Sequence, residues 1–195
     1  MVFLIRAFIA CEISDEVRKG LSDIQEKLKK GVQFTRANPS WVKVDSMHLT
    51  LKFLGEIPET RIDEIEGAMK QAAEEAAAFE IGVKGLGVFP HEHNPKVLWI
   101  GVKRGRQKIE ELQSRLDDAL EHIGFEKERR PFHPHFTLAR IKSPRGSRQL
   151  MDIMKSHSGE DAGTCGIDRL ILFKSQLHPK GAIYTRLKEV IFPTQ

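Results

Sequence analysis

The pattern His-x-Thr-Leu occurs twice in the chain, and it constrains the fold more than any other feature of the sequence. The first copy is His48–Leu51 and the second is His135–Leu138. Eight histidines and seven threonines in 195 residues would give about 0.3 His-x-Thr pairs by chance, and the leucine that follows makes each copy rarer. Two copies whose histidines are 87 positions apart (135 minus 48) indicate an internal duplication. The alternative is two unrelated strands with exposed polar faces.

Both copies are predicted to lie on β-strands, in which successive side chains point to opposite faces. His48 and Thr50 then share one face, opposite the leucines of the motif. His135 and Thr137 are arranged in the same way. Each motif would offer a polar face to a cleft and an apolar face to a core. A pseudo-two-fold axis would bring the two polar faces together across one cleft.

The hydrophobic pattern predicts a similar order of elements around both motifs: a helix, the motif strand, a second helix and then two strands. Other strands are predicted at residues 2–11, 79–89, 96–103, 169–174 and 182–187. Helices are predicted from Ser14 to Gly31, from Pro58 through Ala72, and over 109–123 and 150–154. Residues 32–40 are predicted to form a loop.

Helices mixed with hairpin-like strand pairs predict an α+β fold with antiparallel sheets. No linker or low-complexity segment separates the two halves of the sequence. Residues 1–195 are therefore predicted to form a single bilobal domain. In it, two pseudo-symmetric lobes of antiparallel sheet carry outer helices, and the duplicated strands face a central cleft. A chain of this length needs neither a disulfide nor a metal to fold.

The charge balance permits an anionic partner without requiring one. The chain is 40% hydrophobic and 30% charged, with a formal net charge of +4 and a pI of about 9.1. Its basic residues concentrate at 103–106, 129–130 and 140–148. Such clusters are most often solvated surface, and contact with nucleic acid is the alternative interpretation.

The two cysteines and the N-terminal segment predict a cytoplasmic protein. Cys11 and Cys165 show no Cys-x-x-Cys spacing and are expected to be reduced thiols. The apolar run at residues 2–11 is interrupted by Arg6 and is too short to span a membrane. It is predicted to be a buried first strand rather than a secretory signal, and no membrane partner is expected.

Two imidazoles and two hydroxyls that face each other suit phosphoryl chemistry. Imidazole titrates near neutral pH, so one histidine can act as a base while the other acts as an acid. On a cyclic phosphodiester, one would take a proton from water and the other would protonate the departing ribose oxygen. The threonine hydroxyls can hydrogen-bond the non-bridging oxygens. This chemistry requires no metal or cofactor, and the residues alone do not decide which histidine plays which part.

The sequence resembles the 2H phosphoesterase superfamily, and within it the RNA 2′,3′-cyclic phosphodiesterases, historically called 2′-5′ RNA ligases. The resemblance covers nearly the whole chain and rests on these segments: RAFIA at 6–10, WV at 41–42, HLTLKFLG at 48–55, PHFTLAR at 134–140, LFKSQL at 172–177 and GAIY at 181–184.

The resemblance implies a bilobal α+β fold and a metal-independent conversion of an RNA 2′,3′-cyclic phosphate end to a 2′-phosphate. It also implies that His48 is the proton donor and His135 the proton acceptor. Thr50 and Thr137 would bind the phosphate, and Arg140 would contact an anion.

Three further residues have open assignments. Arg140 is five residues after His135, so an ideal strand would point it away from the histidine face, unless a bulge turns it or its long side chain reaches round. Strand alternation places Lys52 on the cleft face, where it could contact phosphate or be a solvated strand-end lysine. Tyr184 could stack on a nucleobase or belong to the core.

Three other functions are alternatives to metal-independent hydrolysis. The same site could join a 5′-hydroxyl to the cyclic end, which is ligation as the reverse reaction. A non-catalytic RNA-end binding module would not need two groups that titrate near neutrality. A metal-dependent hydrolase would use the HisGluHis turn at 91–93, but no third ligand stands at a convincing spacing. A tRNA fragment, a splicing intermediate or a mononucleotide would present the same end, and a monomer is expected.

Overall fold

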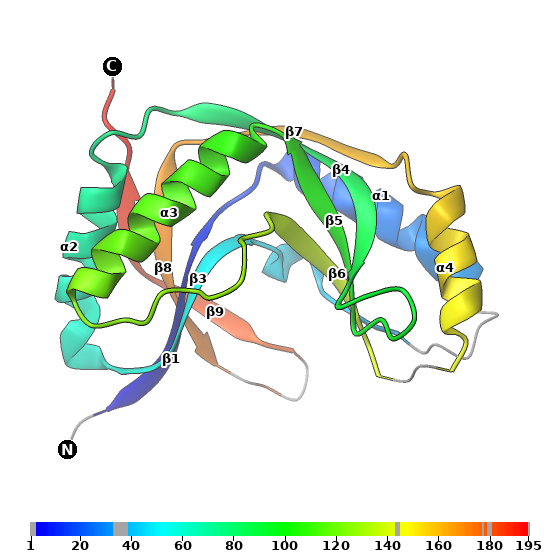
Figure 1. The fold of residues 1–195 in the computed structure, drawn as a ribbon, viewed down its shortest axis with the longest axis horizontal. Coiled ribbons are helices and arrows are strands. Elements are labelled where there is room, and N and C mark those ends of the chain that lie inside the picture. Colours follow the sequence, from blue (N-terminus) through cyan, green and yellow to red (C-terminus); the bar gives the residue numbers. More distant parts are fainter. Residues whose placement is uncertain (1–2, 33–38, 143–144, 177, 179–180, 195) are drawn as a thin grey trace.

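The computed structural model describes residues 3–32, 39–142, 145–176, 178 and 181–194, and contains two antiparallel sheets with helices around them (Figure 1). The α+β prediction is confirmed. The strands are β1 (Leu4–Cys11), β2 (Pro39–Trp41), β3 (Leu49–Pro58), β4 (Phe79–Phe89), β5 (Val97–Arg104), β6 (His135–Ile141), β7 (Asp161–Ile167), β8 (Arg169–Gln176) and β9 (Ile183–Ile191). The helices are α1 (Asp15–Val32), α2 (Ile62–Ala73), α3 (Arg106–His122) and α4 (Ser147–Ser156), with short 3-10 turns η1 (Val44–Ser46) and η2 (Glu59–Arg61).

The helix α1 illustrates how local sequence sets an element. Ser14 precedes it, and the Ser14 hydroxyl oxygen accepts a hydrogen bond from the backbone N–H of Val17 at 3.3 Å. Acidic residues occupy the first turn and lysines the last, which matches the helix dipole. The helix continues to Val32, one residue beyond the glycine predicted to end it.

Each sheet takes strands from both halves of the sequence. Sheet A has the order β3-β1-β8-β9, and sheet B has the order β2-β6-β5-β4-β7. The first motif is therefore attached to sheet A and the second to sheet B. The chain passes from one sheet to the other after β1, β2, β3 and β7, so the lobes in space are not the two halves of the sequence.

Two strands were not predicted. The segment of β7 contains two glycines and little apolar alternation, yet it pairs with β4 along most of its length because tertiary pairing overrides weak β-propensity. Pro39–Trp41 pairs with β6, so the predicted loop 32–40 is wrong at both of its ends. Residues 33–38 of that loop lie outside the described residues.

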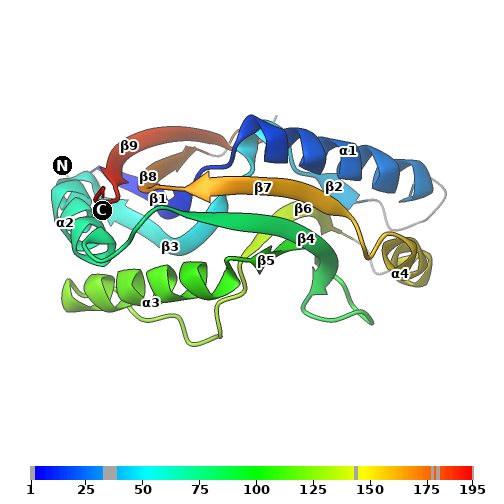
Figure 2. The same ribbon diagram turned by 90° about the horizontal axis from the view of Figure 1, so that it is seen from above.

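The helix that precedes each motif in sequence packs on the sheet of the other motif. The helix α1, which precedes the first motif in sequence, packs on β7 and therefore on sheet B, whereas α2 and α3 lie on the side of sheet A (Figures 1 and 2). Gly20 allows the close approach of α1, because a Cβ there would lie 2.4 Å from the carbonyl oxygen of Ala162. This exchange joins the two sheets into one body.

Most of the apolar side chains form one continuous core. A smaller cluster of Phe8, Ala10, Ile171 and Phe173 lies apart from it on sheet A, with Tyr184 packed against it. Cys11 and Cys165 are both buried and are not joined by a disulfide. Among the described residues, no helix is long and apolar enough to cross a membrane.

Candidate active site

His48 lies immediately before β3 in a half-buried aromatic setting. Its ring centroid is 4.6 Å from that of Phe173 and 5.4 Å from that of Tyr184, which it meets edge-on. Its Nδ1 lies 3.2 Å from the carbonyl oxygen of Ser46. Burial lowers the pKa of His48, because desolvation disfavours the charged ring; the hydrogen bond to Ser46 opposes this effect only in part.

His135 is the first residue of β6, and its surroundings mirror those of His48. Its ring lies 5.0 Å from Phe89, edge to face, and 6.2 Å from Trp99. Its Nδ1 lies 2.6 Å from the carbonyl oxygen of His133. Burial again lowers the pKa of His135, against a smaller opposite effect of that hydrogen bond.

The two histidines each make the same kind of hydrogen bond, and it determines which ring nitrogen carries the hydrogen. In each, Nδ1 contacts the carbonyl oxygen of the residue two positions earlier. A carbonyl oxygen can only accept, so Nδ1 carries the hydrogen in both neutral rings. Nε2 is thereby left with its lone pair available to a substrate. Each ring is oriented so that the same nitrogen can take up or give a proton.

A β-bulge in β6 resolves the position of Arg140. Thr137 pairs with Trp99, but the next pair joins Ala139 to Leu98, so Leu138 is an extra residue. Leu138 and Ala139 are both buried, and Arg140 is exposed. The extra residue reverses the alternation, which puts Arg140 on the face that carries His135 and Thr137.

A matching bulge in β3 gives the opposite outcome for Lys52. Thr50 pairs with Ala10 and Lys52 with Ile9, which leaves Leu51 as the extra residue. Lys52 therefore turns inward and forms a buried ion pair with Asp117 of α3, so its predicted place on the motif face is wrong. Phe53, which is 69% exposed, takes that face instead.

The two bulges make Phe53 and Arg140 equivalent. Each is five residues after the histidine of its motif, and each follows a bulge at the motif leucine. One motif thus presents an aromatic ring where the other presents a guanidinium. Phe53 was not predicted as a site residue, although aligning the two motifs gives it the position equivalent to Arg140.

Contacts from α1 link the two motifs. The two motif strands β3 and β6 contact each other. The Nε2 of buried Gln25 donates to the carbonyl oxygens of Val42 at 2.9 Å and of Leu138 at 2.8 Å. The backbone N–H of Val42 also donates to Leu138 at 2.9 Å. The segment that leads to His48 is therefore tied directly to the strand that carries His135.

Trp99 and two glycines form the sheet surface beside His135. Trp99 stands opposite Thr137 in the register, so both lie on one face. A Cβ at Gly87 would lie 2.1 Å from the Trp99 ring, and one at Gly101 would lie 3.2 Å from it. The indole Nε1–H is buried and has no hydrogen-bond partner among the described residues. The glycines leave room for the indole, whose plane makes an angle of 60° with the His135 ring.

Tyr184 is half-buried against the small cluster on sheet A and contacts His48 edge-on. It thus lies beside the first motif rather than in the main core. The HisGluHis segment at 91–93 forms a turn after β4, with rings of His91 and His93 6.2 Å apart. Within the described ranges, no three histidine, cysteine or carboxylate side chains are gathered so as to hold a metal ion.

Comparison with known proteins gives a consistent family relationship. The family described as the 2′-5′ RNA ligase superfamily matches residues 9–179. The chain is 32% identical over 184 residues to the RNA 2′,3′-cyclic phosphodiesterase of Methanothermobacter thermautotrophicus, covering 94% of this chain and 97% of the relative. It is 36% identical over 189 residues to that of Thermotoga maritima, covering 96% and 95%.

Solved structures share the fold. A crystal structure of a Thermus thermophilus protein superposes with a TM-score of 0.78 at 28% identity, covering 96% of this chain and 98% of that one. Escherichia coli LigT, crystallised with 3′-AMP, superposes with a TM-score of 0.75 at 21% identity, covering 98% and 100%. The two-sheet arrangement with exchanged helices is therefore a shared architecture.

Proposed function

The chain belongs to the 2′-5′ RNA ligase superfamily of 2H phosphoesterases, and we propose that it hydrolyses an RNA 3′-terminal 2′,3′-cyclic phosphate to a 2′-phosphate without a metal. Relatives that match nearly its whole length are named RNA 2′,3′-cyclic phosphodiesterases. The observation that carries the proposal is that His48 and His135 each bind a backbone carbonyl oxygen through Nδ1. This leaves Nε2 of both rings available to a substrate.

The proposed reaction uses one histidine on each side of phosphorus. Nε2 of His135 accepts a proton from water, and the water oxygen forms a bond to phosphorus. The bond between phosphorus and the ribose 3′ oxygen breaks, and His48, protonated at Nε2, gives its proton to that oxygen. The roles follow the family resemblance, since the surroundings of the two rings are alike.

The threonines and Arg140 are assigned to the phosphate. Thr50 and Thr137 are each two residues after a catalytic histidine and share its face, so their hydroxyls can donate to the non-bridging oxygens where charge gathers during transfer. Arg140 reaches the same face through the bulge in β6, and its guanidinium suits a phosphate oxygen.

We further propose that the substrate is an RNA end such as that of a tRNA fragment, and that the enzyme acts as a cytoplasmic monomer of one bilobal domain. Light scattering during gel filtration tests the monomer, because a mass near twice 22.2 kDa would contradict it.

The experiment that tests the function uses a short RNA ending in a 2′,3′-cyclic phosphate, incubated with the protein in excess EDTA. The product end is then mapped as a 2′- or 3′-phosphate. We expect complete conversion to the 2′-phosphate. His48→Gln and His135→Gln should each lower the turnover rate by about 10²–10⁴-fold, with RNA binding largely retained. Thr50→Ala and Thr137→Ala should lower it less.

Other outcomes identify the alternatives. Tight binding without conversion would make the protein an RNA-end binding module. A 2′-5′ linked product in the presence of an RNA with a 5′-hydroxyl would show ligation as the reverse reaction. Loss of activity in EDTA would overturn metal independence, and a near wild-type rate in either histidine variant would overturn the paired-histidine mechanism.

A further inference from the structure

Lys52 and Asp117 fix the loop of residues 126–130 beside the first motif. Both are buried, with exposed fractions of 7% and 8%. Lys52 Nζ also donates to the carbonyl oxygen of Glu126 at 2.6 Å. The carboxylate of Asp117 accepts from the backbone N–H of Glu128 at 2.9 Å. One buried ion pair thus holds the strand of the first motif, the helix α3 and the loop together.

The loop ends in two arginines that no neighbour neutralises. Arg129 and Arg130 are exposed, and neither takes part in an ion pair within the described part of the chain. The preceding Lys127 differs, because it pairs with Asp118 at 2.8 Å and with Glu121 at 3.1 Å. The two guanidinium groups are therefore available to an anion from outside the protein.

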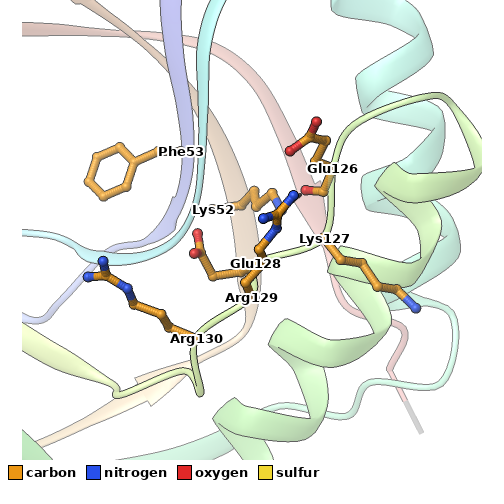
Figure 3. A pocket seen from close by; sticks show the side chains of 7 residues that line it. All are labelled: Lys52, Phe53, Glu126, Lys127, Glu128, Arg129 and Arg130. Carbon is orange, nitrogen blue, oxygen red and sulfur yellow. Dashed lines mark hydrogen bonds between the residues drawn. The ribbon is translucent and has the colours of Figure 1, made fainter.

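A groove of about 390 Å³ lies between this loop and β3 (Figure 3). In Figure 3 the Phe53 ring and the Arg130 guanidinium point to the same side, whereas Lys52 points the other way toward α3. Glu128 also points to the side of Phe53. The Glu128 carboxylate excludes phosphate from its own position. The two arginines flank it, with Arg130 on the side of Phe53 and Arg129 pointing toward Lys52 and Glu126.

We propose that this groove binds the single-stranded RNA that leads to the cyclic end, with Arg129 and Arg130 contacting phosphates of the strand. This rests on the proposed function, and it makes an oligonucleotide a better substrate than a mononucleotide. The groove adjoins the first motif, because Phe53, which lines it, shares the face of Thr50 on β3. An exposed ring beside free cations is the combination that binds single strands without sequence preference.

The experiment compares two substrates, a nucleoside 2′,3′-cyclic phosphate and a six-nucleotide RNA with the same cyclic end. In the double variant Arg129→Gln/Arg130→Gln, KM for the RNA should rise about tenfold, as expected for two exposed charge contacts. The turnover number and KM for the mononucleotide should stay unchanged. The dependence of log KM on log salt should become less steep by about 1.4 for the RNA.

A matched control removes the same charge elsewhere. Lys19 and Lys30 are exposed on α1, which covers sheet B, so Lys19→Gln/Lys30→Gln should leave KM for the RNA unchanged. The proposal is overturned if the arginine variant leaves KM for the RNA unchanged, or if it raises both KM values equally. If the wild type cleaves neither substrate, the proposed function fails. In that case fluorescence anisotropy with the labelled RNA tests whether the groove binds RNA. Equal affinities of the wild type and the arginine variant would overturn the groove proposal.

Discussion

Gln25 and Leu138 are joined by a buried hydrogen bond of 2.8 Å, although they lie 113 positions apart in the sequence. The same side-chain amide donates to Val42, in the segment that leads to His48. A helix that belongs in sequence to the first motif therefore holds the strand of the second. This polar contact connects the segment that leads to His48 with the strand that carries His135.

Gln25→Met should destabilise the protein and lower its turnover rate. Methionine keeps the volume but cannot donate, so the carbonyl oxygen of Val42 loses a buried partner, at a cost of about 1–3 kcal/mol. Urea unfolding measures the loss, and hydrolysis of the cyclic RNA end measures the turnover. Gln149→Met on the exposed surface of α4 is the control and should leave both quantities unchanged. A fully active, equally stable Gln25→Met protein would mean that the amide does not hold the motifs in place.

Lys52→Met should be among the most destabilising single changes near the site. It leaves the Asp117 carboxylate buried without its cation, which costs about 3–5 kcal/mol. The double variant Lys52→Met/Asp117→Leu should recover part of that loss, because no charge is then buried unpaired, while the Glu126 carbonyl and the Glu128 N–H still lose their side-chain partners. Unfolding free energies of the two single variants, the double variant and the wild type form the test.

The neighbouring Lys127 provides the control for that experiment. It pairs with Asp118 and Glu121 at the surface, so Lys127→Met should change the stability little. Equal effects of Lys52→Met and Lys127→Met would contradict a special role for the buried pair.

Gly87→Ala should impair catalysis through Trp99. The added methyl group would lie 2.1 Å from the ring, and the ring must move away from its place beside His135 and Phe89. We expect a lower turnover rate for the cyclic end, together with a shifted tryptophan fluorescence spectrum. Gly166→Ala in β7 is the control, because nothing lies within 4 Å of the added atom. An unchanged spectrum in Gly87→Ala would show that the ring had not moved.

The two motifs show how far the sequence could be interpreted. Their alternation correctly predicted that each motif keeps its histidine and threonine on one face, opposite its buried apolar residues, since strand periodicity is a local property. The predicted place of Lys52 was wrong and that of Arg140 was left open for one reason: a single extra residue reverses every later side chain. The bulges arise from pairing with β1 and β5, which the local sequence does not encode. The packing of α1 on sheet B also depends on contacts between distant parts of the chain, so the local sequence does not encode it either.

The stability of the protein should fall as the pH drops through the histidine range. Burial lowers the pKa of both His48 and His135, so below a pH of about 6.5 the unfolded chain binds more protons than the folded one. The stabilising contribution is present above the unfolded pKa and is lost on acidification. Thermal unfolding at several pH values should show a smaller acid-induced loss in the double variant His48→Gln/His135→Gln than in the wild type.

The activity of the free enzyme should be highest below a pH of about 6.5. The competent form has one histidine neutral and the other protonated, and both pKa values are lowered by burial. Above both values nearly every molecule has two neutral rings, so kcat/KM should fall about tenfold per pH unit on the alkaline side. The alkaline decline of kcat should occur at a higher pH than that of kcat/KM, because the bound phosphate anion favours the imidazolium. A kcat/KM that rises through neutral pH would show that the acid is not one of these histidines.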